Sequence, residues 1–227
     1  AKVLIDAKAS LEAKDRAGNT PLMLAVINDK TDVLKCLLFA RAYPYVRDAA
    51  GRSAVAIALA KAYVDVLTIL RASVEKIGAD GRNVLMRSIA NEDITTFDLI
   101  VRSGASLDVC DAAGYTALAL AAQCGDVTFL ERLIAEGAAV DARVDDMTPL
   151  MLAVSKHRLA AVKVLVAAGA ELNLRDKHGN SALALAAQTG DIAIMKTLID
   201  ANASLDAVNE CGHTPLMLAV CRGNATA

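Results

Sequence analysis

The strongest constraint on the fold is a segment that returns at a nearly constant interval along the whole chain. Asp15-Arg-Ala-Gly-Asn-Thr-Pro-Leu-Met comes back as Asp176-Lys-His-Gly-Asn-Ser-Ala-Leu-Ala and as Asn209-Glu-Cys-Gly-His-Thr-Pro-Leu-Met. The Thr of this segment, or its equivalent, occupies positions separated by 33, 30, 33, 32, 33 and 33 residues: Thr20, Ser53, Asn83, Thr116, Thr148, Ser181 and Thr214. A repeat of this length indicates a stack of similar units, each burying its apolar face against its neighbours.

Each unit has the same order of local signals. After the Thr comes an apolar run such as 21–27, which predicts a helix because the hydroxyl can cap it and Pro21 has no N–H to satisfy in its first turn. A break that contains a glycine, such as Gly125, separates this run from a second amphipathic segment, 127–134, which closes at Gly137. Extended residues then lead into the next turn. The unit is therefore predicted to be a helix, a turn, an antiparallel helix and a projecting hairpin.

The motif Asp-x-x-Gly-x-Thr-Pro-Leu, the Leu-Ala-Ala run and the Gly-Ala-x-Leu-Asn/Asp ending resemble the ankyrin repeat. The resemblance covers essentially residues 1–227 and implies an all-α ankyrin-repeat solenoid, with a helix-turn-helix and a projecting β-hairpin loop in each repeat. We expect one array over 1–227, with a partial repeat at 1–14 and a truncated last repeat; the repeats start near residues 15, 48, 78, 111, 143, 176 and 209. Because neither end carries a polar capping repeat, the chain resembles a segment of a longer array.

The family's usual His after Thr-Pro-Leu is absent from every repeat. Met or Ala takes its place, at Met23, Met86, Met151, Met217, Ala56, Ala119 and Ala184. Met fills space adaptably without the hydrogen bonds that a His would make, so we expect the array to rely more on apolar packing. Two forms of the first helix also alternate late in the chain, a Thr-Pro-Leu-Met form and an Ala-Leu-Ala-Leu form, which suggests duplication of a two-repeat unit.

The region 41–82 departs most from the pattern. Tyr43 and Tyr45 flank Pro44 where other repeats have Gly-Ala-x-Leu-Asn, and the next repeat is three residues short, with the deletion placed near Arg71. Two readings stay open: a kink or binding epitope, in which exposed tyrosines serve as anchors, or a drifted repeat in which Tyr45 packs under its hairpin.

Composition and charge exclude several classes of function. The formal net charge of −2 gives no electrostatic reason to bind nucleic acid or an anionic membrane, and no apolar stretch approaches the ~20 residues of a membrane span. The five cysteines are odd in number and lack CxxC spacing, which argues against a disulfide framework or a zinc site and for a reducing compartment. We expect each cysteine to be a small buried apolar residue.

No arrangement of residues predicts catalysis, a metal or a cofactor. The three histidines fall at a helix break and two hairpin tips without ligand spacing, namely His157, His178 and His213. Asp145 and Asp146 occupy a turn, where solvated carboxylates are a better interpretation than an acid/base pair. Every recurrent glycine belongs to a turn of the repeat rather than to a phosphate-binding loop. We therefore predict that the chain is not an enzyme.

The resemblance implies that the chain binds a protein through its hairpin tips and the concave face of its first helices. The candidate tip residues are Arg16, Asn19, Arg52, Arg82, Tyr115, Met147, Lys177, His178, Asn180 and His213. The candidates before the helix breaks are Asn91, Gln123, Lys156 and Gln188. The residue just before the Thr or its equivalent is never acidic in the seven repeats, and the positions before the helix breaks also lack acids. This favours an acidic or extended partner segment, although solvated turns alone would give the same bias. Tyr115, among small neighbours, is the preferred anchor.

The expected function is that of a protein-protein interaction scaffold. Two alternatives remain: a substrate-docking segment of a larger enzyme of kinase or ubiquitin ligase type, and the cytosolic ankyrin domain of a membrane protein. We expect a monomer in the cytoplasm, with the nucleus as a second location. Asn173 holds the place that a dioxygenase hydroxylates in some members of the family, but an Asn that stabilises its own hairpin is the simpler interpretation.

Overall fold

The computed structural model describes residues 1–40, 42–61, 63, 65, 66, 69, 81–102 and 105–224. Within these residues the regular structure is helical, and the only paired extended residues are Val144 and Met147, which form an isolated antiparallel bridge. The predicted all-α solenoid is confirmed. The helices are α1 (Lys2–Asp6), α2 (Pro21–Ile27), α3 (Thr31–Phe39), α4 (Ala54–Ala60), α6 (Val84–Ala90), α7 (Ile94–Arg102), α8 (Ala117–Cys124), α9 (Val127–Ala135), α10 (Pro149–Ser155), α11 (Leu159–Ala167), α12 (Ala182–Thr189), α13 (Ile192–Asp200) and α14 (Pro215–Cys221).

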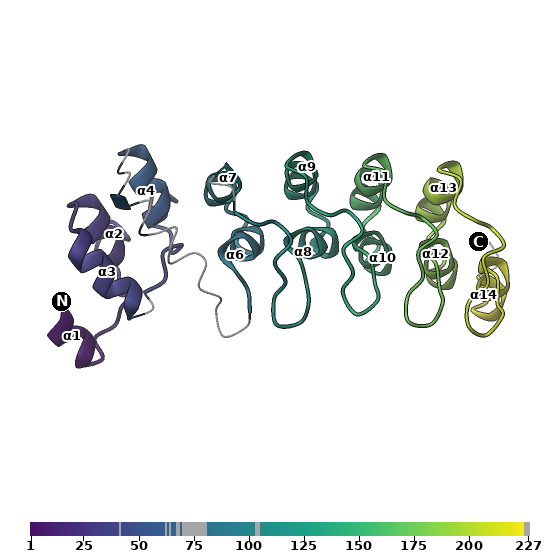
Figure 1. The fold of residues 1–227 in the computed structure, drawn as a ribbon, viewed down its shortest axis with the longest axis horizontal. Helices are drawn as coiled ribbons and strands as arrows, with labels where there is room; N and C mark the ends of the chain where they lie inside the picture. Colours follow the sequence, from purple (N-terminus) through teal and green to yellow (C-terminus); the bar gives the residue numbers. More distant parts are fainter. Residues whose placement is uncertain are drawn as a thin grey trace. The chain divides into compact units, whose positions relative to one another are not determined.

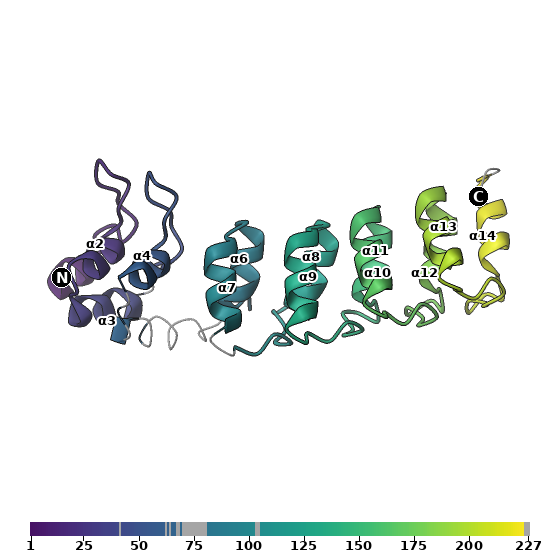
Figure 2. The same ribbon diagram turned by 90° about the horizontal axis from the view of Figure 1, so that it is seen from above.

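The chain divides into two compact units. The first comprises Ala1–Gly78 and Asn83–Gly104, and the second comprises Ala79–Arg82 and Ala105–Ala227. In the first unit α2 packs against α3 and α4, and α6 packs against α7. In the second unit the first helices α8, α10, α12 and α14 stand in one row, and the second helices α9, α11 and α13 stand in a parallel row (Figures 1 and 2).

The first helices begin where the repeat predicts. The side-chain oxygen of each marker residue accepts a hydrogen bond from the backbone N–H three residues later, as Thr116 does from Ala119 at 3.2 Å. The same N-cap forms at Thr20, Ser53, Asn83, Thr148, Ser181 and Thr214. Such a cap satisfies one of the free N–H groups of the first turn and is worth about 1 kcal/mol.

The predicted helix ends are also confirmed. Gly125 closes α8 with φ +81° and Gly137 follows α9 with φ +87°. Both angles lie in the left-handed region that glycine adopts at no steric cost. The corresponding Gly104 lies outside the described residues.

The core explains why the chain is 55% hydrophobic but only 3% aromatic. α12 lies between α10 and α14, and its residues Ala182, Leu183, Ala184, Ala186 and Ala187 are buried. Residues 117–122 of α8 are buried throughout as well. Small side chains let these helices approach closely. The second helices are amphipathic: Phe129, Leu130 and Leu133 are buried in α9 while Glu131 is exposed. Large aromatic side chains therefore have few places in the stack.

The tyrosines of the irregular region lie mainly inside the first unit. Tyr45 is 6% exposed, and the Tyr43 ring meets it edge-on at 5.3 Å between centroids. The Arg87 guanidinium lies 5.5 Å from the centroid of the half-buried Tyr43 ring. Burial raises the pKa of the Tyr45 hydroxyl well above its usual value, and the neighbouring Tyr43 adds to this. Tyr45 thus packs in the core rather than serving as an exposed anchor, while the deletion near Arg71 lies outside the described residues.

The prediction of buried cysteines is wrong. All five are exposed: Cys36, Cys110, Cys124, Cys211 and Cys221. They lie on outer helix faces, at helix ends and in hairpins, which the repeat leaves in solvent, so a general preference of cysteine for the interior does not apply.

None of the helices in the described ranges is both long and apolar enough to cross a membrane.

Candidate functional site

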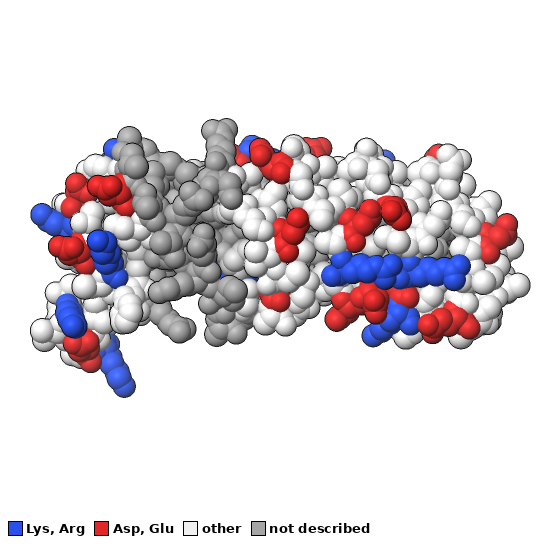
Figure 3. Space-filling model, in the orientation of Figure 1, with Lys and Arg blue, Asp and Glu red and all other residues white. Residues whose placement is uncertain are grey.

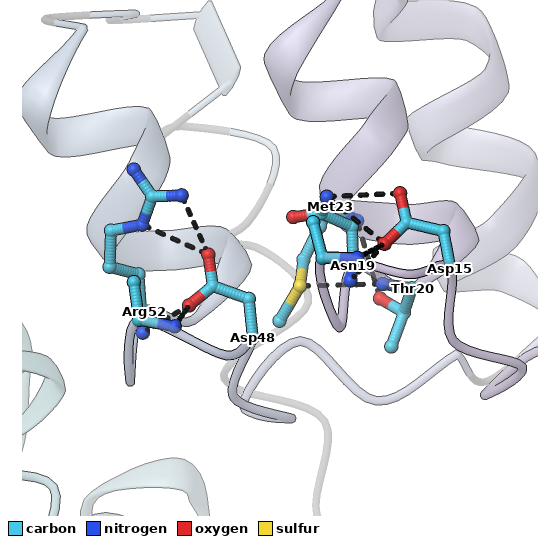
Figure 4. Close-up of polar contacts among 8 residues, drawn as sticks. Asp15, Asn19, Thr20, Met23, Asp48 and Arg52 are labelled. Atoms are coloured by element: carbon cyan, nitrogen blue, oxygen red, sulfur yellow. Dashed lines mark hydrogen bonds and ion pairs between the residues drawn. The ribbon is translucent and has the colours of Figure 1, made fainter.

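In the described structure, four hairpin tips are each shaped by an Asp carboxylate and one by an Asn amide oxygen. The Oδ1 atom of Asp176 accepts hydrogen bonds from the backbone N–H groups of His178 and Asn180, both at 2.8 Å. The backbone N–H of Asp176 donates to the Asn180 carbonyl at 3.0 Å, which closes the turn. The same arrangement occurs at Asp15, Asp48, Asp111 and Asn209. Figure 4 shows the tips of Asp15 and Asp48. The exposed residues at each tip thus stand on a fixed backbone.

The tip at 143–147 is built differently. Val144 and Met147 exchange both backbone hydrogen bonds at 2.8 Å, and Asp145 and Asp146 between them have φ +47° and +63°. Two successive left-handed residues define the tight hairpin turn that favours Asp at this position. Both carboxylates are exposed, as the solvated-turn interpretation predicts.

Neighbouring tips are joined to each other. The Glu210 N–H donates to the His178 carbonyl at 3.1 Å, and the Asn209 amide donates to the Asn180 side chain at 3.0 Å. A Cβ on Gly179, whose φ is +77°, would lie 2.8 Å from the Glu210 nitrogen, so only glycine fits this approach. In the first unit, the Ala49 N–H donates to the Ala17 carbonyl in the same way. These neighbouring tips therefore form connected pairs instead of independent loops.

A second set of bonds joins repeats at the base of the hairpins. Asp108, Asp141 and Asn173 each accept a backbone N–H from the following repeat, at 3.0, 3.1 and 2.9 Å, donated by Ala139, Glu171 and Ser204. Glu12 does the same for the Tyr43 N–H at 2.7 Å. Asn173 therefore stabilises the junction with the next repeat. Sequence reasoning missed this role, although the same place holds a carboxylate or amide side chain five times, which was a usable signal: Glu12, Asp108, Asp141, Asn173 and Asp206.

The predicted tip residues fall into three structural groups. Asn19 and Asn180 are buried and donate to the Asp of their own turns. Arg52 forms a two-pronged pair with Asp48, at 2.9 and 2.8 Å, and Arg82 pairs with Asp111 at 3.5 Å. The remaining ones present surface to solvent, with Arg16, Lys177 and His178 exposed and Tyr115, Met147 and His213 half-buried.

Tyr115 and Met147 come together on the second unit. Both pack against a buried cluster of Ala119, Val144 and Leu152. They thus form a half-buried apolar surface at the foot of two neighbouring tips. Of the positions before the helix breaks, Asn91 and Lys156 are exposed and Gln123 and Gln188 are half-buried: these are the side chains that a partner could reach.

The electrostatics of the second unit are mixed. On the face shown in Figure 3, Lys and Arg side chains form a line with Asp and Glu on both sides of it. The exposed tips carry Asp145, Asp146 and Glu210 beside Lys177, whereas the helix breaks carry the exposed Lys156 and Arg222. The tip side of the surface is therefore mixed in charge, with the basic Lys177 among acidic residues.

Two tip carboxylates have shifted acidities. The Asn19 side chain and backbone N–H lower the pKa of Asp15 below its usual value of 3.8. Desolvation acts to raise the pKa of Asp48, but hydrogen bonds from the backbone and guanidinium of Arg52 outweigh it and the pKa is lowered. Both shifts belong to carboxylates that hold a turn together, not to reactive groups. Among the described residues, no three His, Cys, Asp or Glu side chains could hold a metal ion together.

Comparison with known proteins agrees with this architecture. The family described as "Ankyrin repeats (3 copies)" matches residues 85–176 and 168–227, and a single "Ankyrin repeat" matches residues 17–49. The chain is 28% identical to the Ankyrin repeat and KH domain-containing protein mask-1 of Caenorhabditis elegans, over 84% of this chain and 7% of that protein. It is 33% identical to Rabankyrin-5 of Mus musculus, over 75% of this chain and 15% of that protein, and 36% identical to human Ankyrin repeat and SOCS box protein 6, over 41% and 23%.

The chain thus spans a small part of the relatives that it matches. What it shares with them is the ankyrin repeat. Ankyrin repeats are generally protein-protein interaction modules. On its period, its fold and these matches, the chain belongs to the ankyrin repeat family.

Proposed function

We propose that the second unit binds a protein segment along its row of hairpin tips and helix breaks. The observation that supports this most is the way in which the tips are held. Each backbone is fixed by internal hydrogen bonds, and the tips at 176–180 and 209–213 are bonded to each other. A partner that binds this edge meets a backbone that is already ordered, so binding avoids part of the conformational entropy cost of association.

The side chains on this edge suggest the chemistry of the partner. Tyr115 and Met147 offer a half-buried apolar patch, which suits an apolar side chain of the partner. The exposed Lys156 and Arg222 at the helix breaks suit an acidic group. Since these side chains, from Tyr115 to Arg222, are spread over several repeats, an extended segment that crosses the repeats contacts more of them than a compact partner surface would.

The other predicted residues have supporting roles in this proposal. Asn180 holds a tip in shape from inside, and Arg82 is paired with Asp111 at the edge of the same unit. Lys177, His178 and His213 line the tip row, and Gln123 and Gln188 line the break row. Arg16, Asn19, Arg52 and Asn91 belong to the first unit, for which we propose no shared surface with the second.

The chain could also be a docking segment of a larger enzyme or an ankyrin domain of a membrane protein. In both alternatives this surface would still bind a protein. One relative is named for a KH domain and another for a SOCS box beside their repeats. The proposal therefore concerns what the repeats bind, whichever polypeptide carries them.

Site-specific photocrosslinking tests the proposed surface. A photoreactive residue is placed at one exposed tip position at a time, replacing Ala113, Asp146, His178 or Glu210. Matched controls replace Glu131, Lys163 or Lys196, which are exposed on the second helices α9, α11 and α13. After irradiation in cell extract, we expect the same partner protein to be joined to several tip positions and to none of the controls. Crosslinking to that partner mainly from the second helices would overturn the proposal.

A further inference from the structure

Tyr115 and Met147 hold a position that is polar in the other repeats. The residue just before the N-cap of the first helix is elsewhere Asn19, Arg52, Arg82, Asn180 or His213. The side chains of Asn19, Arg52 and Asn180 each bond to the Asp that begins their own tip. Tyr115 and Met147 pack instead on the buried cluster around Leu152. In two adjacent repeats the foot of the tip is therefore apolar, and we call Tyr115 and Met147 the apolar patch.

The helix break after α10 carries three consecutive basic residues, two of which are bonded within the chain. The Nδ1 atom of His157 lies 3.2 Å from Oδ2 of Asp191, and Nε of Arg158 donates to the Gln123 carbonyl at 3.3 Å. The third, Lys156, is exposed, and no ion pair within the described residues holds its ammonium group. Lys156 is thus the cation at this break that a partner can pair with.

The apolar patch and Lys156 lie at opposite ends of one helix. Met147 directly precedes Thr148, the N-cap of α10, and Lys156 is the C-cap. At about 1.5 Å per helical residue, Thr148 and Lys156 are about 12 Å apart along the helix axis. Between them Leu152 is 4% exposed, and the Ser155 hydroxyl donates to the Leu152 carbonyl at 2.8 Å. An apolar contact point and a cationic one are therefore held at a fixed separation, with an uncharged surface between them.

We propose that the partner segment carries an apolar residue and an acidic residue about four positions apart, bound by the apolar patch and by Lys156. This inference rests on the proposed function and adds the pattern that its surface selects. An extended chain advances about 3.3 Å per residue, so about four residues span the separation. A single ammonium group suits one carboxylate. Gln123 and Gln188 are half-buried on the helices beside α10, and their side-chain amides, which make no hydrogen bond within the described residues, suit the backbone of such a segment.

Selection from a displayed library of random peptides tests this pattern. Photoreactive groups at His178 or Glu210 identify the selected peptides that lie on the proposed surface. We expect these peptides to be enriched in an apolar and an acidic residue three to five positions apart. Lys156→Glu, used in a parallel selection, should enrich Lys or Arg in place of the acid at the same distance. The control Lys163→Glu makes the same change of charge at an exposed position of α11 and should leave the pattern unchanged.

Affinities of one selected peptide separate the two contacts. Lys156→Glu should weaken its binding about tenfold, and changing the peptide's acid to Lys should recover most of that loss with the variant but not with the wild type. Tyr115→Ala should weaken binding whether or not the acid is present, with circular dichroism to show that the variant is folded.

The outcomes distinguish this inference from the proposed function. Peptides that crosslink to the tips but lack the acid, or that keep it in the selection with Lys156→Glu, would overturn the pattern and leave the proposed function standing. Peptides that bind mainly at the second helices, or a library without any binder, would count against both.

Discussion

Asp176 illustrates how a single side chain determines the geometry of a possible contact surface. One of its oxygens accepts two backbone N–H groups, and its other oxygen accepts the side-chain amide of the buried Asn180 at 3.3 Å. Without these acceptors, the buried Asn180 would lose the partners of its backbone N–H and its side-chain amide, at a cost of about 1–3 kcal/mol. At the scale of residues, Asp176 and Asn180 therefore hold the shape of the tip, while its exposed side chains, Lys177 and His178, do not.

The substitution Asp176→Ala should lower the free energy of unfolding by about 1–3 kcal/mol, because it leaves the His178 and Asn180 N–H groups without their acceptor. Asp176→Asn should cost less than half as much, since Asn209 holds the next tip with an amide oxygen. Urea unfolding followed by circular dichroism measures both values. Equal losses for the two variants would show that the turn does not depend on this oxygen.

Acid should weaken the tips of the first unit. The pKa of Asp48 is lower in the folded chain than its ordinary value of 3.8, because hydrogen bonds from Arg52 outweigh the effect of burial. Its contribution to stability is therefore complete above the unfolded pKa and is lost as the pH falls from there towards the folded pKa. We expect the difference in unfolding free energy between the wild type and Asp48→Asn to shrink below about pH 4.

The control for this experiment is Asp32→Asn, which removes an exposed carboxylate on α3 with the same change of net charge. Its difference from the wild type should vary less with pH than that of Asp48→Asn. Parallel curves for the two variants would contradict a specific role of Asp48.

At the scale of helices, α10 and α14 share the hexapeptide Pro-Leu-Met-Leu-Ala-Val. Comparing them shows that the same residues contribute differently to stability in different places. The caps are alike: Thr148 and Thr214 both accept from the N–H three residues on, at 3.3 Å. What differs is the number of first helices packed against each one. α10 contacts both α8 and α12, whereas α14 contacts α12. The local sequence therefore determines where a helix begins, whereas its neighbours determine how much it contributes to stability.

Met151→Ala should lower the free energy of unfolding by about 2–5 kcal/mol, because Met151 is 1% exposed and its loss leaves a cavity between α10 and its neighbours. Met217→Ala, in the same hexapeptide but 50% exposed, should cost about 1 kcal/mol or less. Thermal and urea unfolding of the two variants provide the comparison. Similar losses would mean that the burial of Met151 is not what stabilises this repeat.

These helices also show what the sequence could and could not predict. Period, N-caps and glycine breaks are local, so the starts of helices at Thr116 and Thr148 and the end of α8 at Gly125 followed from the residues alone. Burial depends on neighbouring repeats, and here sequence reasoning was less successful. It placed the cysteines inside, and it did not foresee that Asn180 would be enclosed at its tip or that Asp108 would bond to the next repeat.

At the scale of the molecule, the second unit is a row of repeats held together in three ways: by apolar packing of first helices, by bonds between tips and by bonds at the hairpin bases. Each junction between successive repeats therefore combines apolar packing with hydrogen bonds. A surface made this way can be altered at its exposed tip residues with little loss of stability, since surface substitutions usually change it by less than about 0.5 kcal/mol.

The most direct test of the central claim, that a protein binds at the tip row of the second unit, compares two triple variants for affinity towards the crosslinked partner. The tip variant is Asp146→Lys, Lys177→Glu and Glu210→Lys, and the second-helix variant is Glu131→Lys, Lys163→Glu and Asp200→Lys, so that both change the net charge equally. Isothermal titration calorimetry should show at least about tenfold weaker binding for the tip variant, or about 1.4 kcal/mol, and little change for the other. Unchanged binding by the tip variant, with weaker binding by the second-helix variant, would contradict the account.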